Sequence, residues 1–309
     1  MGLFSKIKSP VFTKRDSEAE KHLAELKEIK KSLTGESLDK AEQEIIRLEA
    51  GIIGEKQVCF ELENSHMPMF VLHDLFLEHN GLKAQIDFLV ITRKNFYIIE
   101  CKNLYGNIEI DSSGSFVRSY QYKGKTIKEG IYSPITQNQR HLELIKAIRE
   151  DSKGNPLSKI IFNAGFSDNY HAIVVLANPK TVLNDRYAKK EVKSQVIRAD
   201  QLVSYIKQKD NEKDKFPCSE KEMEELAEFF MAQNKENPVD YVQKFRDMAK
   251  EPEIRSDLHD QPSQSAVCPE CGAPMVLRMA KKGPNAGKQF YGCSKYPKCK
   301  GVRNVQAEA

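Results

Sequence analysis

The chain has no apolar run that approaches the roughly 20 residues needed to span a bilayer. Its first residues, Met1-Gly-Leu-Phe-Ser-Lys-Ile-Lys, lack the apolar core of a secretory leader. Lys6 occupies the position where a myristoylation signal has serine or threonine. Glycine loops of the Walker and Rossmann types are absent as well. These absences argue against a membrane protein and against nucleotide-driven chemistry, and we expect a cytoplasmic protein.

Charge is distributed unevenly along the chain. The 309 residues carry a net charge of +4, and 40% of them are hydrophobic, which suffices for a real core. The length suggests about two domains. Residues 275–303 alone contribute eight positive charges and no negative one, which leaves −4 for the remainder. The basic character therefore belongs to the C-terminal end of the chain.

The seven cysteines fall into two groups. Three are scattered, at Cys59, Cys101 and Cys218, which is typical of a reducing compartment and not of a disulfide scaffold. The other four form two close pairs, which provide the four thiolates that a structural zinc ion binds tetrahedrally. We therefore expect structural Zn²⁺ held by Cys268, Cys271, Cys293 and Cys299.

Basic and aromatic side chains are interleaved around these cysteines. Cations displace counterions from phosphates, and exposed rings offer faces on which unpaired bases stack. The segment is therefore a candidate surface for single-stranded DNA, although the rings could instead pack against the zinc knuckles. The candidate binding residues are Arg278, Lys281, Lys282, Lys288, Phe290, Tyr291, Tyr296 and Lys298.

This segment resembles the C-terminal zinc finger of bacterial type IA DNA topoisomerases. The resemblance rests on Cys-Pro-x-Cys-Gly272-x-x-Met275-Val-Leu-Arg278 and on Phe290-Tyr-Gly-Cys-Ser-x-Tyr-Pro-x-Cys-Lys-Gly301. It implies a DNA-binding accessory module. It does not imply topoisomerase activity, because the chain has neither a DxD pair nor a large strand-passage domain.

Hydrophobic periodicity predicts a mixed α and β organisation ahead of the zinc segment. Helices are expected at 17–34, 38–59, 134–149 and 199–208, and two more within 219–250, where Ser219 and Glu222 form a capping-box pattern. Strands are expected at 69–76, 86–91, 96–99, 171–177 and 195–198. Residues 251–266 are polar and lack periodicity, which is typical of a flexible linker.

Three charged residues in the segment 85–102 could carry chemistry. Alternation along a strand places Glu100 and Lys102 on one face. With a two-residue hairpin loop at Arg93-Lys94, Asp87 faces Glu100; with the loop at Lys94-Asn95, Asp87 faces Lys102. Either register gathers two carboxylates and one ammonium among apolar neighbours, where such charges need a metal or one another. Two carboxylates can hold Mg²⁺, and a lysine can position water and stabilise a developing phosphorane charge.

Asp87 with Glu100-x-Lys102 resembles the core of the PD-(D/E)xK nuclease superfamily, and the surrounding sequence resembles the nuclease-related domain, NERD. The supporting motifs are Gly51-x-x-Gly54-Glu55, Gln85-Ile-Asp87, Ile99-Glu100-x-Lys102-Asn103, Gly106 and Ser133-Pro134-x-x-Gln137. The resemblance covers about residues 45–150, or extends to about residue 210, and implies a restriction-endonuclease-like α/β fold, in which helices flank a mixed sheet. It departs from the superfamily pattern at Ile86, where proline is expected.

The resemblance also implies roles for site residues. Asp87 and Glu100 would bind Mg²⁺ or Mn²⁺, Lys102 would be the catalytic lysine, and Glu55 and Gln137 would be auxiliary. A solvated helix face explains Glu55 equally simply, and Gln137 could only satisfy a helix end. His141, one helical turn beyond Gln137, is interpreted as structural because a lone histidine at helical spacing usually is.

We therefore expect a metal-dependent DNA nuclease that hydrolyses phosphodiester bonds, with a zinc ribbon that binds DNA. The alternative is a non-catalytic DNA-binding adaptor, or a regulatory partner of a topoisomerase or helicase in DNA repair or defence. A nucleoid-associated location would fit either function, and the sequence indicates no dimer surface. The expected divisions are an N-terminal helical segment (1–40), a nuclease-like domain (41–210), a helical extension (211–250), the linker (251–266) and a zinc finger (267–305).

Overall fold

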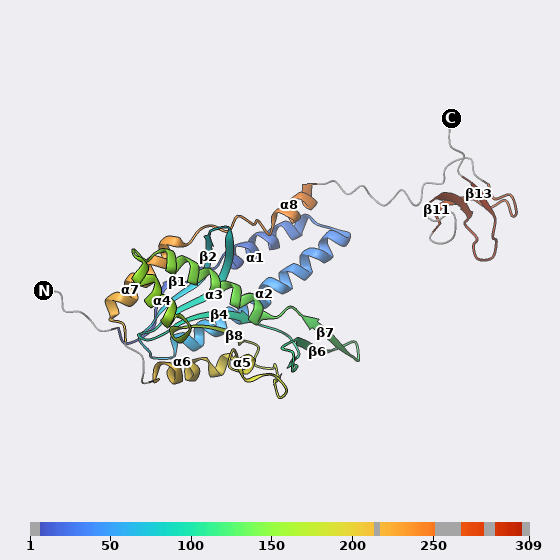
Figure 1. The fold of residues 1–309 in the computed structure, drawn as a ribbon. Helices are drawn as coiled ribbons and strands as arrows, with labels where there is room; N and C mark the ends of the chain where they lie inside the picture. Colours follow the sequence, from blue (N-terminus) through green and yellow to red (C-terminus); the bar gives the residue numbers. More distant parts are fainter. Residues whose placement is uncertain (1–6, 213–216, 251–266, 281–287, 305–309) are drawn as a thin grey trace. The chain divides into compact units, whose positions relative to one another are not determined.

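The computed structural model describes residues 7–212, 217–250, 267–280 and 288–304. The chain forms two compact units, Met1–Arg246 and Asp247–Ala309. The larger unit is a mixed α/β structure, and the smaller one contains the four clustered cysteines (Figure 1). The predicted fold class, a mixed sheet flanked by helices with a small C-terminal zinc ribbon, is confirmed. The expected linker at 251–266 lies outside the described residues.

The main sheet of the larger unit has six strands in the order β1-β2-β3-β4-β8-β10. Strands β2, β3 and β4 form an antiparallel meander, whereas β1 runs parallel to β2. Beyond β4, the strands β8 and β10 extend the sheet in parallel. The bounds are β1 (Val11–Lys14), β2 (Phe70–His79), β3 (Leu82–Ile91), β4 (Phe96–Lys102), β8 (Tyr170–Leu176) and β10 (Val196–Arg198).

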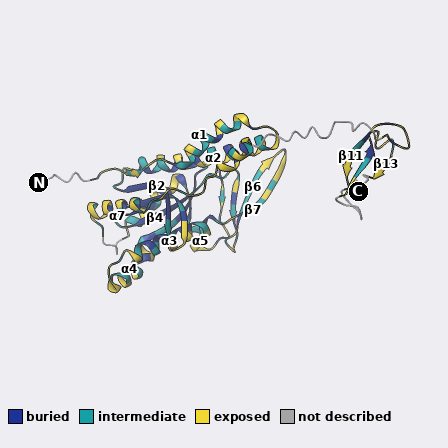
Figure 2. Cartoon of the chain, turned by 90° about the horizontal axis from the view of Figure 1, so that it is seen from above, coloured by how far each residue is buried: buried dark blue, intermediate teal, exposed yellow. Residues whose placement is uncertain are grey.

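Helices cover both faces of this sheet (Figures 1 and 2). Helices α3, α4 and α7 pack on one side, called here the α3 face, and α2 and α6 pack on the other, the α2 face. Helix α1 packs on α2. The bounds are α1 (Glu18–Ile29), α2 (Gly35–Glu63), α3 (Pro134–Asp151), α4 (Pro156–Asn169), α5 (Lys190–Lys193), α6 (Leu202–Asp210), α7 (Glu220–Gln233) and α8 (Gln243–Lys250), with short 3₁₀ turns at Lys30–Ser32 and Ala199–Gln201. No described helix has the length and apolar character of a membrane span.

Because both faces are covered, the central strands are apolar at nearly every position. In β3 and β4, Leu89 and Ile98 pack on the α3 face, whereas Val90 and Ile99 pack on the α2 face. The dark interior strands in Figure 2 follow from this double cover.

A second sheet, in the order β7-β6-β5-β9, is inserted between β4 and α3 in the chain, with β9 added from a later segment. Its buried side chains Ile108, Ile110 and Phe116 pack with Val174 and Leu176 of β8. Strands β6 and β7 form a hairpin that projects from the body (Figure 1). The bounds are β5 (Asn107–Ile110), β6 (Phe116–Tyr122), β7 (Lys125–Ile131) and β9 (Leu183–Asn184).

The expected helices and strands are present, with shifted ends and several additions. The helix expected at 38–59 extends from Gly35 to Glu63, and the one expected from residue 17 begins at Glu18 because the Ser17 side chain caps it. The sequence analysis missed β1, α4 and all four strands of the second sheet. Helix α7 buries Met223 and Phe230 in the main core, so this part of 211–250 packs on the sheet.

Candidate functional site

The β3–β4 hairpin determines where Asp87 and Glu100 lie. Phe88 pairs with Ile99 across the two strands, which makes Arg93-Lys94 the two-residue loop. Continued by one residue beyond this pair, the register places Asp87 beside Glu100. The other register considered from the sequence, with the loop shifted by one residue, is wrong.

The regular alternation of β3 is interrupted at Asp87. Ile86 packs on the α3 face and Phe88 on the α2 face, although residues two apart normally share a face. The neighbouring strand has a matching irregularity at Asp74, whose φ is +56°. At this position the Asp87 carboxylate reaches β4, where its Oδ2 accepts a hydrogen bond from the Cys101 N–H at 2.7 Å. Asp87 is thereby held between the two charged residues at the end of β4.

Glu100, Lys102 and Gln137 form a continuous set of polar contacts on the α3 face. Glu100 is only 2% exposed, and its Oε1 lies 2.6 Å from Lys102 Nζ. Lys102 Nζ also donates to Gln137 Oε1 at 3.2 Å. Ser133 caps α3 and Pro134 opens it, which places Gln137 in the first turn, near the strand end. The structure therefore brings these three residues together.

Helix α3 contributes two further polar side chains that the sequence analysis did not place in the site. His141 Nδ1 lies 3.5 Å from Glu100 Oε2, and Asn138 Nδ2 donates to the carbonyls of Ile98 and Ile173 at 2.9 Å each. Glu100 Oε2, His141 Nδ1 and Asn138 Oδ1 are buried and lack a hydrogen-bond partner among the described residues. Buried polar atoms are normally paired, so this group can accept a cation or a water. The spacing of His141 from Gln137, one helical turn, was the available sequence signal.

Glu55 approaches the site from α2, on the opposite face. A Cβ at Gly54 would come within 2.6 Å of Asn103 Cβ, so the glycine lets α2 lie directly against the end of β4. Glu55 Oε2 lies 2.9 Å from His73 Nε2, and the charge of Glu55 contributes to raising the pKa of Asp87. His73, which the sequence analysis missed, therefore holds Glu55 in place.

The charges of the site strongly influence one another. Burial, followed by the charges of Glu100 and Glu55, holds the pKa of Asp87 well above its ordinary value. Burial also raises the pKa of Glu100, although Lys102 opposes this. For Lys102, burial lowers the pKa, but the charge and hydrogen bond of Glu100 and the charge of Asp87 together outweigh burial, so the net pKa is raised. Burial and the charge of Lys102 lower the pKa of His141 to about 4. At neutral pH, Lys102 is therefore protonated and His141 is neutral.

The donor atoms suit a hard divalent cation. Mg²⁺ prefers oxygen ligands, keeps several waters and commonly uses one or two protein carboxylates together with substrate phosphates. Asp87 and Glu100 offer such oxygens at neighbouring positions, and a cation would relieve their repulsion. They do not form a closed cage, because Glu55 bonds to His73 and Glu100 Oε1 to Lys102. Across the described ranges, only the four cysteines gather three or more ligand groups within metal-binding reach.

The four cysteine sulfurs of the smaller unit lie within 4.8 Å of one another. The Sγ atoms are 3.7 Å apart in the pair Cys268 and Cys299, and 3.5 Å apart in the pair Cys271 and Cys293. Tetrahedral zinc with Zn–S bonds of about 2.3 Å requires sulfur separations of about 3.8 Å. A Cβ at Gly301 would collide with the Cys268 sulfur, so only glycine fits there. The cluster therefore fits structural zinc.

The finger has a three-stranded antiparallel sheet of β11 (Met275–Met279), β12 (Gln289–Cys293) and β13 (Val302–Asn304). A groove of about 950 Å³ is lined by Arg278, Phe290, Tyr296 and other residues of this unit. The Arg278 guanidinium lies 5.6 Å from the centre of the Tyr296 ring, which is 59% exposed. Tyr291 instead packs against the cysteines. Lys288 and Lys298 are exposed, whereas Lys281 and Lys282 lie outside the described residues.

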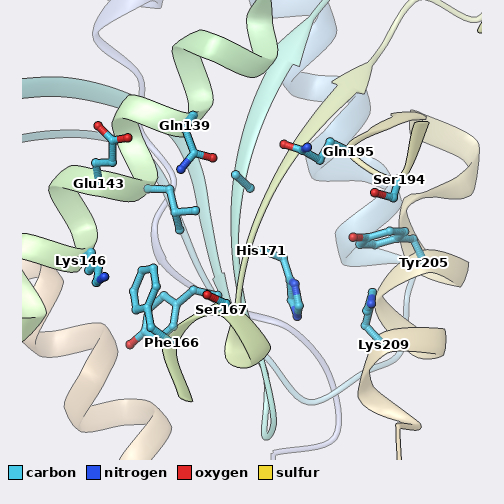
Figure 3. A pocket seen from close by; sticks show the side chains of 13 residues that line it. Gln139, Glu143, Lys146, Phe166, Ser167, His171, Ser194, Gln195, Tyr205 and Lys209 are labelled. Atoms are coloured by element: carbon cyan, nitrogen blue, oxygen red, sulfur yellow. The ribbon is translucent and has the colours of Figure 1, made fainter. Parts of the chain in front are cut away.

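A cavity of about 560 Å³ lies elsewhere in the larger unit, between α3, α4 and α6 (Figure 3). Its lining includes Glu143, Lys146, His171 and Lys209. It opens beside the beginning of β8, whereas Glu100 and Lys102 pair with the end of that strand. None of the five predicted site residues of the larger unit lines it, so it is separate from the candidate site.

Comparisons with known proteins agree with this geometry. Residues 50–177 match the family model of the nuclease-related domain, and residues 265–308 match that of the topoisomerase DNA-binding C4 zinc finger. An uncharacterized protein of Haemophilus influenzae is 38% identical over 53 residues, which cover 17% of this chain and 27% of that protein. The uncharacterized protein YrdD of Escherichia coli is 48% identical over 42 residues, which cover 14% of this chain and 21% of YrdD.

The chain thus spans only about a quarter of the length of these curated relatives. No solved structure matches it. The sulfur geometry and the family match both support structural zinc, and the family match supports DNA binding by the smaller unit. The chain therefore carries a nuclease-related domain, within which the candidate site lies, and a topoisomerase-type C4 zinc finger.

Proposed function

We propose that this protein is a metal-dependent DNA nuclease that hydrolyses phosphodiester bonds, with its zinc finger holding the DNA. The observation that carries the proposal is the cluster of Asp87, in the middle of β3, with Glu100 and Lys102 at the end of the adjacent strand β4. Burial and the charge of Glu55 raise the pKa values of both carboxyl groups, the charge of Glu100 raises that of Asp87 as well, and the lysine beside them is protonated. Such a combination lowers the stability of the fold, and groups with strongly shifted pKa values cluster at functional sites. The cluster also lies within a nuclease-related domain.

Each residue would have a distinct part in the reaction. Asp87 and Glu100 would hold Mg²⁺ or Mn²⁺, which supplies Lewis-acid activation of water and of a phosphoryl oxygen. In hydrolysis, a water oxygen bonds to phosphorus and the water gives up a proton, while the bond to one ester oxygen breaks and that oxygen takes up a proton, so that no net proton is consumed. Because Lys102 is protonated, it would orient the water or neutralise charge on the phosphorane and would not act as a general base. Gln137 would orient Lys102 Nζ through their hydrogen bond.

The runner-up is a DNA-binding adaptor that does not cleave. One observation favours it, since Glu55 and Glu100 are already engaged by His73 and Lys102 and do not converge as a metal cage. In that case the charged cluster would only join β4 to α3. The two functions differ in whether divalent metal leads to broken DNA.

The proposal is tested by incubating the purified protein with plasmid and single-stranded DNA, with Mg²⁺ or Mn²⁺ or without divalent metal. We expect metal-dependent cleavage that falls about 100-fold or more when Lys102→Met removes the ammonium group. Because this change leaves Glu100 buried and unpaired, Glu100→Gln and the double variant with both changes are measured beside it. Thermal unfolding of each variant identifies any that fail to fold.

Lys207→Met is the matched control, because Lys207 is exposed on α6, away from the cluster. It should cleave like the unaltered protein. Binding of DNA without cleavage in either metal would contradict the nuclease and support the adaptor. Cleavage that survives in the folded double variant would contradict the assigned site.

A further inference from the structure

The second sheet begins beside the candidate site. Its core packs against Val174 and Leu176 of β8. In the β4–β8 register, Val174 pairs with Glu100 and Leu176 with Lys102. The chain enters this sheet shortly after Lys102 and returns to α3 shortly before Gln137. The base of the β6–β7 hairpin therefore lies near Glu100 and Lys102, the groups that would act on a phosphodiester.

One face of this hairpin carries a row of tyrosines. Because residues two apart on a strand share a face, Tyr120 and Tyr122 lie on the same face of β6 as Phe116. The Phe116 side chain is buried at the base of the hairpin. The Tyr105 ring meets the Tyr120 ring edge-on, with centroids 6.0 Å apart. Tyr105 is 63% exposed and Tyr122 is 56% exposed. The row thus extends from the buried base toward the hairpin tip and becomes more exposed.

Tyr105 is held against the hairpin by its neighbour. Gly106 has a φ of +95°, and a Cβ there would come within 2.5 Å of the Ser119 carbonyl oxygen. Only glycine permits this close approach of the segment after β4 to β6. Tyr105 and the β6–β7 hairpin therefore form one surface, called here the tyrosine ridge.

The tyrosine ridge is positively charged within an otherwise acidic part of the chain. Residues 116–132 contain one arginine, three lysines and one glutamate, a net charge of +3, whereas the other residues of the unit Met1–Arg246 sum to −2. Arg118 pairs with Glu129 and lies over the Tyr120 ring, 4.9 Å from its centre. Lys123, Lys125 and Lys128 are exposed and make no ion pair with any residue that the structure describes.

We propose that the tyrosine ridge binds an unpaired nucleic-acid strand and leads it to the Glu100 and Lys102 site. Exposed ring faces stack on unpaired bases of any sequence, and the unpaired lysines neutralise phosphates. A duplex keeps its base faces stacked on one another, so the ridge selects single strands. The proposal rests on the proposed function, since it names the form of substrate that the same site receives.

The absence of tryptophan from the chain provides a local reporter. Tyr122→Trp in the full chain places a single tryptophan on the ridge, and stacking of a base on it quenches its fluorescence. Oligodeoxyuridylate, oligouridylate and a duplex of equal length are titrated without divalent metal, so that no cleavage is needed. We expect saturable quenching by the single strands and little by the duplex, and the two single strands show whether the sugar matters.

Two matched controls accompany the reporter. Leu157→Trp places a tryptophan at an exposed position of α4, and it should not be quenched. In the Tyr122→Trp protein, Lys125→Glu should weaken the apparent affinity about threefold or more at moderate salt, whereas Lys207→Glu should not. Lys125 pairs with Tyr122 across the hairpin, so the charge change lies beside the reporter.

The outcomes separate this inference from the proposed nuclease. Quenching without cleavage in metal would support the ridge and contradict the nuclease. If the folded Tyr122→Trp protein binds labelled oligonucleotide but its tryptophan is not quenched, the zinc finger alone binds the strand and the ridge is wrong. Equal quenching by duplex and single strand would overturn the selectivity.

Discussion

The surroundings of Asp87 disfavour its ionised form when no cation is bound. Burial and the neighbouring charges of Glu100 and Glu55 raise its pKa, so the folded state binds a proton that the unfolded chain releases. The contribution of Asp87 to the free energy of unfolding therefore falls as the pH rises from about 4, the ordinary pKa of aspartate, through the raised pKa of Asp87 in the folded state. A bound cation would offset the same cost.

From this we predict that Asp87→Asn stabilises the protein at neutral pH in the absence of divalent metal. The amide oxygen can still accept the Cys101 N–H, while the buried charge is removed. We expect the Tm to rise by about 2–4 °C near pH 8 and the difference to vanish below about pH 4. Added Mg²⁺ should raise the Tm of the unaltered protein but not that of Asp87→Asn. A variant that is less stable at every pH would show that Asp87 is a structural anchor instead.

At the scale of elements, two glycines of α2 have different physical roles although the sequence motif presents them together. A Cβ at Gly51 would meet nothing within 4 Å, whereas one at Gly54 would collide with Asn103 and approach Ala177 and Cys101. Gly54 therefore sets the distance between α2 and the strand end. Gly51 is only a helix-weakening residue at an exposed position.

These two positions make a matched pair of substitutions in one helix. Gly51→Ala should raise the free energy of unfolding by up to about 1 kcal/mol through helix propensity. Gly54→Ala should lower it by about 1–3 kcal/mol, because the overpacked contact outweighs the gain in propensity. Chemical denaturation of both variants measures the difference, and a stabilising Gly54→Ala would mean that α2 can move away from β4 without cost.

At the scale of the whole molecule, the chain joins a nuclease-related domain and a zinc finger that form separate compact units. A finger with so small a core depends on its metal for stability. A DNA-binding module tethered to a unit with almost no net charge of its own raises the concentration of DNA near that unit. The finger should therefore influence cleavage through substrate capture and not through chemistry.

We predict that Cys293→Ser, which removes one zinc ligand, unfolds the finger and leaves the unfolding transition of the larger unit unchanged. Under the proposed function, cleavage of long DNA at moderate salt should fall severalfold more than cleavage of a saturating short oligonucleotide. Zinc content, thermal unfolding and the two cleavage rates test this. Equal losses on both substrates would indicate that the finger contributes to the chemical step.

The sequence alone determined the features that depend on residue type and short spacing. Four cysteines in two close pairs predict a zinc centre wherever the rest of the chain lies, and long apolar runs predict the strands of a doubly covered sheet. Asp87, Glu100 and Lys102 were named as a cluster for the same reason, since a tight hairpin brings them together in either register. The second sheet was missed because its strands are half-exposed and lack a strong apolar pattern.

Only the tertiary structure decided the register, the hydrogen-bond partners and the neighbours that come from distant segments. The pairing of β3 with β4 makes Arg93-Lys94 the hairpin loop. Packing also places His73 within hydrogen-bonding distance of Glu55, and His141 beside Glu100. The tertiary structure also packed the half-buried Tyr291 against the cysteine cluster and left Tyr296 exposed. These outcomes depend on packing between helices and strands that lie far apart in the chain, which local patterns do not encode.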